Sequence, residues 1–249
     1  MGMKLLTDKR VVITGGGSGI GADMALAFAE AGAQVTITGR RKSALQAVAD
    51  QHSHLDFAVV DVTDEAAMVA LFEKIGRVDI VIANAGAAES APFAKTSFEQ
   101  WQRMLNVNLS GVFLTLREGL KQLNDGGRLI AVASTAGLKG YAYVGAYCAA
   151  KHGVVGLVRS LAAETATRNI TVNALCPGFT DTPLLAASVD NIVAKTGQSA
   201  EQATSHFEST NPTGRLVTPA EVTATALWLC GPNSGAINGQ AISISGGEV

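Results

Sequence analysis

Cysteine is scarce in this chain, and its few copies do not form a metal-binding or redox motif. The 249 residues include three cysteines, Cys148, Cys176 and Cys230, and none of them have CxxC spacing. The four histidines also lack a convincing metal arrangement. We therefore expect no resident metal and no disulfide framework, and we interpret the cysteines as reduced, mostly buried thiols in a cytoplasmic protein.

An excess of one charge and long apolar runs are missing too. The formal net charge is −2, so no broad basic face for nucleic acid is indicated. No run approaches the roughly 18 apolar residues of a membrane span, and residues 1–8 lack the apolar region of a signal peptide. The sequence predicts a cytoplasmic protein whose partner is a small molecule, not a nucleic acid or a membrane.

Aromatic residues make up only 5% of the chain, whereas glycine is plentiful with 27 copies. That balance favours many short strand–helix turns over a β-sandwich. In the first part of the chain we expect strands at 10–14, 34–38, 55–60 and 78–83, separated by helices at 19–31, 43–51 and 64–75. This alternation indicates a parallel sheet covered on both faces.

The rest of the chain repeats this rhythm with longer helices. We expect one helix at 97–123, a strand at 128–133, a helix at 146–167, and strands at 170–175 and 241–244. Residues 182–215 carry no strand pattern and are interpreted as a mobile helical lid. The sequence predicts a single doubly wound, Rossmann-like α/β domain with a seven-stranded parallel sheet. Residues 1–135 would bind a cofactor, and 136–249 would hold the catalytic part and the lid.

The helices at 97–123 and 146–167 carry apolar residues on more than the one face that would pack on the sheet. This indicates that a further surface buries the remaining apolar residues. We interpret that surface as a subunit interface and expect a homotetramer, or else a homodimer. Val158 is a candidate interface position, although its side chain could instead face the sheet.

A glycine-rich turn lies between the first expected strand and the first expected helix. Gly15, Gly19 and Gly21, with Ser18 and Ile20 between them, form its core. Glycines permit unusual φ angles and let a phosphate reach backbone N–H groups at the start of a helix. The turn predicts a site for the pyrophosphate of a dinucleotide.

Tyr147 and Lys151 lie four residues apart in an expected helix, so they share a face. A free tyrosine has a pKa of about 10, which makes it a poor acid or base at neutral pH. The lysine charge would favour the phenolate and lower that pKa. Ser134 lies at the end of an expected strand thirteen residues before Tyr147. This set predicts proton transfer by Tyr147.

Taken in order, these motifs resemble the classical short-chain dehydrogenase/reductase family over essentially the whole chain. The matching pieces are Thr14–Gly21, Asp61, Asn84-Ala85-Gly86, Asn108, Ser134, Tyr147-x-x-x-Lys151 and Pro177-Gly178. One departure is Ala83, where the family usually has a further asparagine.

The resemblance implies roles for the catalytic residues. Tyr147 would be the general acid/base, and Lys151 would bind the nicotinamide ribose and lower the tyrosine pKa. Ser134 would hydrogen-bond the substrate oxygen. Asn108 would hold a water in a proton path to the lysine, with Asn106 as the competing choice.

The resemblance also implies cofactor contacts. Asp61 would touch the adenine ring, with Val62 beside it. The loop after the sixth strand would hold the nicotinamide amide and the diphosphate. The implied cofactor residues are Gly15, Ser18, Gly19, Ile20, Gly21, Arg40, Arg41, Asp61, Val62, Asn84, Ala85, Gly86, Tyr147, Lys151, Pro177, Gly178, Thr180 and Thr182.

The choice of cofactor depends on the end of the second strand, where an acidic residue would indicate NAD. The chain has Gly39-Arg40-Arg41-Lys42 there instead. Arginine suits the 2′-phosphate of NADP because of its planar fork. Ser18 stands where a basic residue is a second common NADP marker. The sequence favours NADP(H) and leaves NAD(H) open.

The expected function is NAD(P)-dependent hydride transfer between the nicotinamide and a carbonyl or secondary alcohol. The expected pocket residues are Ser134, Tyr141, Tyr143, Tyr147, Phe179, Leu184 and Leu185. The segment through Gly246-Gly247 resembles members that act on 3-oxoacyl or 3-hydroxyacyl compounds. The alternative is a dinucleotide sensor or scaffold without turnover, against which the intact set of Ser134, Tyr147 and Lys151 argues.

Overall fold

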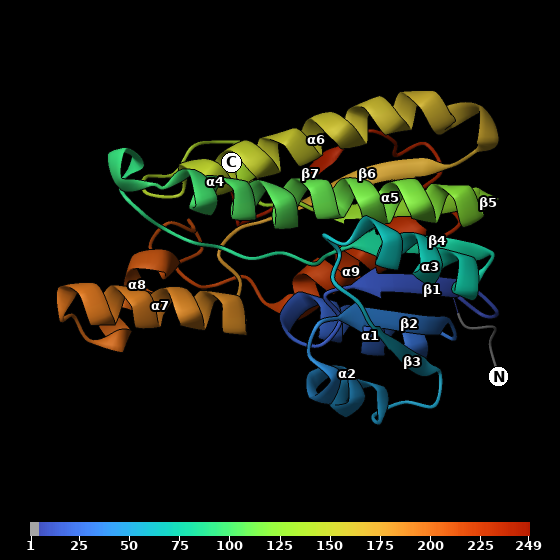
Figure 1. Ribbon diagram of the computed structural model, residues 1–249, viewed down its shortest axis with the longest axis horizontal. Coiled ribbons are helices and arrows are strands. Elements are labelled where there is room, and N and C mark those ends of the chain that lie inside the picture. Colours follow the sequence, from blue (N-terminus) through green and yellow to red (C-terminus); the bar gives the residue numbers. More distant parts are fainter. Residues whose placement is uncertain (1–4) are drawn as a thin grey trace.

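Seven parallel strands form one sheet in the computed structural model, which describes residues 5–249 (Figure 1). The strands are β1 (Arg10–Thr14), β2 (Gln34–Gly39), β3 (Leu55–Val59), β4 (Val78–Ala83), β5 (Leu123–Val132), β6 (Thr171–Pro177) and β7 (Ala241–Ile244). Their order is β3-β2-β1-β4-β5-β6-β7, so the strand order reverses between β1 and β4. The predicted doubly wound fold is confirmed, and the reversal places a crevice at the carboxyl ends of these strands.

Helices cover both faces of the sheet (Figure 1). They are α1 (Gly19–Glu30), α2 (Lys42–Ala49) and α9 (Pro219–Cys230) on one face, and α3 (Glu65–Ile75), α5 (Gly111–Gln122) and α6 (Gly145–Thr165) on the other. In β1, Val11 and Ile13 belong to the core beneath α1, α2 and α9, whereas Val12 belongs to the core beneath α3, α5 and α6. This alternation explains why the strand is apolar at every position in the middle.

The single helix predicted at 97–123 is wrong in detail. Helix α4 (Phe98–Leu105) is separated from α5 by the π-helical turn η2 (Asn106–Ser110), and Leu123 already begins β5. The N–H of Gly111 donates to the Asn106 carbonyl, which is the wider spacing of a π turn. Thr115 Oγ1 donates back to the Gly111 carbonyl at 2.7 Å. The turn carries Asn108, whose side chain is completely buried.

Val158 is not an interface position. Its side chain is fully buried in the core between α6 and the sheet, with Val154 and Val172 in the same cluster. A helix that lies across a sheet buries one apolar stripe against it, and Val158 is on that stripe. Apolar surface that faces outward is instead found at Phe98 and Phe113, which are 69% and 41% exposed.

The lid predicted at 182–215 is helical, as expected. Helices α7 (Pro183–Thr196) and α8 (Ala200–Glu208) lie together beyond the end of the sheet in Figure 1, and they share a small core of Val189, Ala203 and Phe207. Within residues 5–249, no helix is both long and apolar enough to cross a membrane. The prediction on a signal peptide concerns residues 1–8, of which 1–4 lie outside the described residues.

Candidate active site

A cleft of about 850 Å³ runs along the carboxyl ends of the strands and under the lid. It is in the upper part of the size range of small-molecule sites. Apart from Gly21, every site residue predicted from the sequence lines this cleft. It also contains residues that the sequence did not indicate, among them Ser90, Asn191 and Phe207. Asn191 Nδ2 donates to Ser90 Oγ at 3.1 Å and so ties α7 to the loop after β4.

The glycine turn between β1 and α1 has the backbone that its sequence predicted. Gly15 and Gly19 have φ angles of 69° and 55°, in the left-handed region that favours glycine. Gly21 serves a different purpose. A Cβ there would lie 2.3 Å from the Gly15 carbonyl oxygen and 2.4 Å from Asn84 Nδ2. Gly21 therefore permits close packing behind the turn instead of lining the cleft.

Asn84 connects the end of β4 to this turn. Its Nδ2 donates to the carbonyls of Thr14 and Gly15 at 3.0 and 3.2 Å, and its backbone N–H donates to Thr14 Oγ1 at 3.1 Å. The N–H of Ala85 donates to the same hydroxyl at 3.1 Å. These bonds hold the two strands on either side of the topological switch at a fixed spacing.

Ser134, Tyr147 and Lys151 all line the cleft, and the Ser134 side chain forms a hydrogen bond with Tyr147. Ser134 follows β5, and its Oγ accepts from the Ala136 N–H at 3.1 Å. Tyr147 and Lys151 lie in the first turns of α6, with Lys151 Nζ 5.5 Å from the centre of the Tyr147 ring. The ammonium group donates to the Val132 carbonyl at 2.8 Å. Because the Lys151 side chain is only 3% exposed, burial lowers its pKa to about 8.

The pKa of Tyr147 differs from the sequence-based expectation. Burial raises it to about 12, and the hydrogen bond with the Ser134 side chain offsets part of that rise. The lowering of the pKa by Lys151 that the sequence predicted is not found in this structure, where desolvation of the phenolate is the largest cause of the shift. Tyr147 in this structure therefore holds its proton at neutral pH.

Asn108 lies next to Lys151, whereas the competing candidate Asn106 is exposed and does not line the cleft. Asn108 Nδ2 donates to the carbonyls of Ala87 and Met104 at 2.9 and 3.0 Å, and its Oδ1 accepts from the Ala87 N–H at 3.2 Å. A Cβ on Gly86 would lie 3.0 Å from Asn108 Oδ1 and 3.8 Å from Lys151 Nζ. Gly86 thus leaves the path between these two side chains open.

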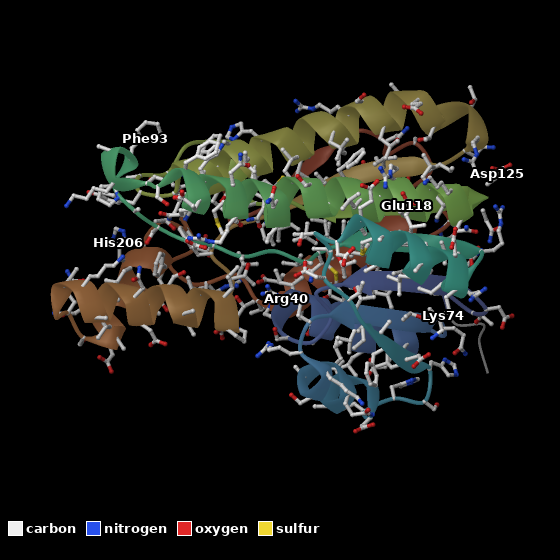
Figure 2. All side chains as sticks on the ribbon, viewed as in Figure 1. Arg40, Lys74, Phe93, Glu118, Asp125 and His206 are labelled. Carbon is white, nitrogen blue, oxygen red and sulfur yellow. The ribbon has the colours of Figure 1, made fainter. Side chains whose placement is uncertain are left out.

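Two arginines line the cleft as well. Arg40 and Arg41 line it beyond β2, and Figure 2 shows Arg40 at the end of the sheet nearest the lid. Arg40 forms a long ion pair with Asp61, 3.9 Å between Nη1 and Oδ2. The Asp61 carboxylate also accepts hydrogen bonds from the N–H and hydroxyl of Thr63, which lower its pKa.

Aromatic rings form the wall of the cleft beneath the lid. Tyr141 meets Phe179 edge to face, with ring centres 5.7 Å apart, and Phe179 meets Phe207 of α8 at 4.6 Å. Tyr143 is 66% exposed and has a φ of 68°, an unusual conformation for a non-glycine residue. Leu184 and Leu185 of α7 complete the wall. His206 is exposed on α8 (Figure 2).

Comparison with known proteins identifies the family. A family model described as enoyl-(acyl carrier protein) reductase matches residues 15–248. An acetoacetyl-CoA reductase of an Acinetobacter species is 32% identical, covering 96% of this chain and 97% of the relative. A 3-oxoacyl-(acyl-carrier-protein) reductase of Chlamydia muridarum is 33% identical, covering 98% of both.

Solved structures agree with these sequence relatives. A variant of the actinorhodin polyketide ketoreductase, crystallised with NADPH, has a TM-score of 0.89 at 32% identity and covers 97% of both chains. Levodione reductase has a TM-score of 0.90 at 31% identity and covers 98% of both. The chain belongs to the short-chain dehydrogenase/reductase family and is, like these relatives, an NAD(P)-dependent oxidoreductase.

Proposed function

We propose that the protein uses NADPH to reduce the keto group of a 3-oxoacyl-type substrate, and that it oxidises the corresponding alcohol in the reverse direction. The observation that carries this proposal is that Ser134, Tyr147 and Lys151 lie together in the lining of the cleft. The acetoacetyl-CoA and 3-oxoacyl reductases among the relatives support the substrate class.

The cleft fits a dinucleotide. Its glycine turn leads into the start of α1, whose N-cap Ser18 makes no side-chain cap hydrogen bond, and a pyrophosphate is favoured at such a helix start. Arg40 and Arg41 would hold the 2′-phosphate, and Asp61 with Val62 would lie at the adenine. Lys151 would bind the nicotinamide ribose, and the loop after β6 would bind the amide. When bound, the nicotinamide supplies or accepts the hydride.

The chain's own residues supply the proton and the positioning. Ser134 Oγ and the Tyr147 hydroxyl would donate hydrogen bonds to the substrate carbonyl oxygen. Tyr147 then gives its proton to that oxygen as the carbonyl carbon gains the hydride, which balances the reduction to an alcohol. Lys151 would stabilise the phenolate left behind. Asn108 would keep a proton path open toward Lys151.

A preference for NADP(H) is part of this proposal. Arg40 and Arg41 are its support, since arginine forks match phosphate geometry. The actinorhodin ketoreductase with NADPH is a relative of the same shape.

Reduction of an enoyl double bond is a second candidate, favoured by the description of the matching family model. In that reaction the hydride goes to the β-carbon of a conjugated double bond, and a proton ends on the α-carbon. The groups in this site instead converge where they can protonate an oxygen beside the reacting carbon, which favours keto reduction.

The decisive experiment follows the absorbance of NADPH with acetoacetyl-CoA, with a cyclic diketone and with crotonyl-CoA. We expect turnover of a keto substrate and none of crotonyl-CoA. Turnover of crotonyl-CoA alone would establish the second candidate. Binding of NADPH without turnover of any compound in a broad ketone panel would indicate a sensor and would refute the proposal.

The first prediction provides the matched control for that assay. Tyr147→Phe keeps the ring and removes the proton donor, so kcat should fall at least about 100-fold, the usual size of a lost acid/base. Binding of NADPH, followed by its fluorescence, should persist. Near-normal turnover of the keto substrate by this variant would remove Tyr147 from the mechanism.

The proposal also covers the setting of the enzyme. We propose a homotetramer or homodimer and a cytoplasmic location, the latter supported by three free cysteines. We further propose one working domain, with cofactor binding in 1–135 and the catalytic part and lid in 136–249.

A further inference from the structure

Glu248, in the segment after β7, contacts the loop between β5 and α6 that carries Lys139 and Tyr141. The Glu248 side chain is only 3% exposed. Its Oε1 accepts a hydrogen bond from the Tyr141 hydroxyl at 2.6 Å and lies 3.0 Å from Lys139 Nζ. A carboxylate buried to this degree needs charged or hydrogen-bonding partners, and Glu248 finds both in one loop.

The same carboxylate reaches the loop after β6. A Cβ on Gly178 would lie 3.2 Å from Glu248 Oε2, so the two segments are in close contact. Gly178 and Phe179 line the cleft. Glu248 therefore lies between two loops that form the walls of the active site, although it does not line the cleft itself.

Tyr141 connects Glu248 to residues that line the cleft. Its hydroxyl lies 2.7 Å from Thr135 Oγ1, next in sequence to Ser134, and its ring packs edge to face on Phe179. With its proton donated to Glu248, the phenol would accept from Thr135. No donor is then left for a substrate, so Tyr141 offers ring surface rather than a hydrogen-bond donor.

Lys139 completes the arrangement on the outer side. Its Nζ lies 5.0 Å from the centre of the Tyr141 ring as well as next to the Glu248 carboxylate. The Lys139 side chain is 38% exposed, which makes it the solvent-facing partner of the buried carboxylate. The ring is thus held by its hydroxyl at one end and by a cation near its centre.

We propose that Glu248 is a positioning residue that fixes the ring of Tyr141 through the Tyr141 hydroxyl and Lys139, and thereby limits the size of the group beside the reacting carbonyl. The inference rests on the proposed keto reduction. It assigns the specificity of the pocket in part to a residue that does not touch the substrate.

The test compares a small and a bulky 3-oxoacyl thioester, acetoacetyl-CoA and 3-oxo-3-phenylpropionyl-CoA, in the unmutated protein and in Glu248→Ala and Tyr141→Phe. The ratio of kcat/KM for bulky over small substrate should rise roughly tenfold in Glu248→Ala, the size of effect that one methylene has on a pocket. The KM for NADPH should stay the same. Glu248→Gln keeps an acceptor for Tyr141 and should restore most of the original ratio.

Two further comparisons separate positioning from a general loss of structure. Glu65→Gln changes an exposed carboxylate paired with Arg117 at 2.7 Å, and it should leave the ratio unchanged. The double variant Glu248→Ala with Tyr141→Phe should show no more change than the larger single variant, because both break the same contact.

An unchanged ratio in a folded Glu248→Ala protein, or additive effects in the double variant, would overturn the inference. If Glu248→Ala does not fold by circular dichroism, Glu248→Gln and Tyr141→Phe decide instead. A shift in the ratio with Tyr141→Phe but not with Glu248→Gln supports the inference, and no shift in either overturns it. Absence of turnover in the unmutated protein would refute the proposed function, whereas turnover with unchanged ratios refutes only the role of Glu248.

Discussion

Lys151 carries an ammonium group into a site where water reaches only 3% of its side chain. Its folded pKa of about 8 lies below the ordinary value of 10.5. A group whose charged form is disfavoured by folding destabilises the protein wherever it is protonated. The shift corresponds to roughly 3 kcal/mol at neutral pH, since one pKa unit is about 1.4 kcal/mol. Such a cost is typical of a group kept for function rather than stability.

Lys151→Met should therefore raise the thermal unfolding midpoint of the cofactor-free protein at pH 7 by several degrees, while abolishing turnover. Loss of the bond to the Val132 carbonyl offsets about 1 kcal/mol of the gain. Burial of the Lys151 charge lowers the free energy of unfolding by its full amount below pH 8. This loss of stability fades as pH rises from 8 to 10.5, because in that range the unfolded chain binds a proton that the folded chain has released. The advantage of the variant should shrink over the same window.

Calorimetry at several pH values measures this effect, with Lys74→Met as a control on an exposed lysine of α3. A midpoint for Lys151→Met below that of the unmutated protein at pH 7 would show that burial of the ammonium is fully compensated.

In the proposed NADP site, Arg40 is the residue that would decide the choice of cofactor. A hydrogen bond to a charged group contributes about 1.5–3 kcal/mol, or roughly 10- to 150-fold in affinity. Arg40→Asp would remove the proposed contact with the 2′-phosphate and add repulsion, so the ratio of kcat/KM for NADPH over NADH should fall by at least that amount. Lys42→Asp is the matched control, because Lys42 is exposed at the start of α2 and does not line the cleft. An equal response of both variants would reduce the role of Arg40 to general charge.

Much of the site could be predicted from short sequence motifs, because the geometry of each motif is set by a few neighbouring residues. The glycine turn and the pair Tyr147 and Lys151 need only local geometry, which sequence spacing specifies. Phe207 and Glu248 could not be found in this way. They reach the site from distant parts of the chain, and no local pattern distinguishes them from an ordinary core aromatic and an ordinary surface acid.

At the scale of elements, periodicity predicts where helices lie but not how they are interrupted. The π-helical turn η2 inserts one residue between α4 and α5. The apolar residues from 97 to 123 keep a helical spacing across it, so their pattern does not reveal the interruption. Helix α9 was not among the predicted elements, although its start carries a clear signal. Thr218 and Glu221 form a capping box around Pro219 at the first helical position.

That capping box also joins the lid to the body of the protein. Glu221 accepts from Arg215 at 2.6 Å and 2.9 Å and from the Thr218 N–H at 2.8 Å. The Arg215 hydrogen bonds, with those from Thr218, lower the pKa of Glu221 from 4.5 to about 2. The stabilisation is therefore complete above pH 4.5 and disappears as pH falls through 2.

Glu221→Gln should accordingly lower the unfolding midpoint at pH 7, and the deficit should diminish as the pH is taken below 4.5. The loss should be modest because the side chain is 40% exposed and solvent screens the pair. Circular dichroism melts at pH 7 and pH 3 measure it, with Glu164→Gln on the exposed face of α6 as the control. A deficit that is independent of pH would assign the effect to packing instead of charge.

At the scale of the whole molecule, two large aromatic side chains remain exposed on the outer helices α4 and α5. Phe98 and Phe113 are exposed there, and the Arg117 guanidinium lies 5.1 Å from the centre of the Phe113 ring. In the proposed oligomer, a second copy of the chain would cover these side chains. A two-fold axis beside α5 would bury both copies of the Phe113 side chain.

Phe113→Glu should therefore weaken assembly of the proposed oligomer. Two carboxylates brought together across a two-fold axis lose hydration and repel each other, so the dissociation constant should rise by at least about tenfold, which is 1.4 kcal/mol. Light scattering across a dilution series measures the mass.

Val59→Glu is the matched control, since Val59 is 52% exposed on β3, away from α4 and α5. Because Phe113 is not in the cleft lining, activity should fall only where assembly falls. An unmutated protein that is active and has the mass of one chain would rule out the interface, and equal weakening by both variants would place it elsewhere.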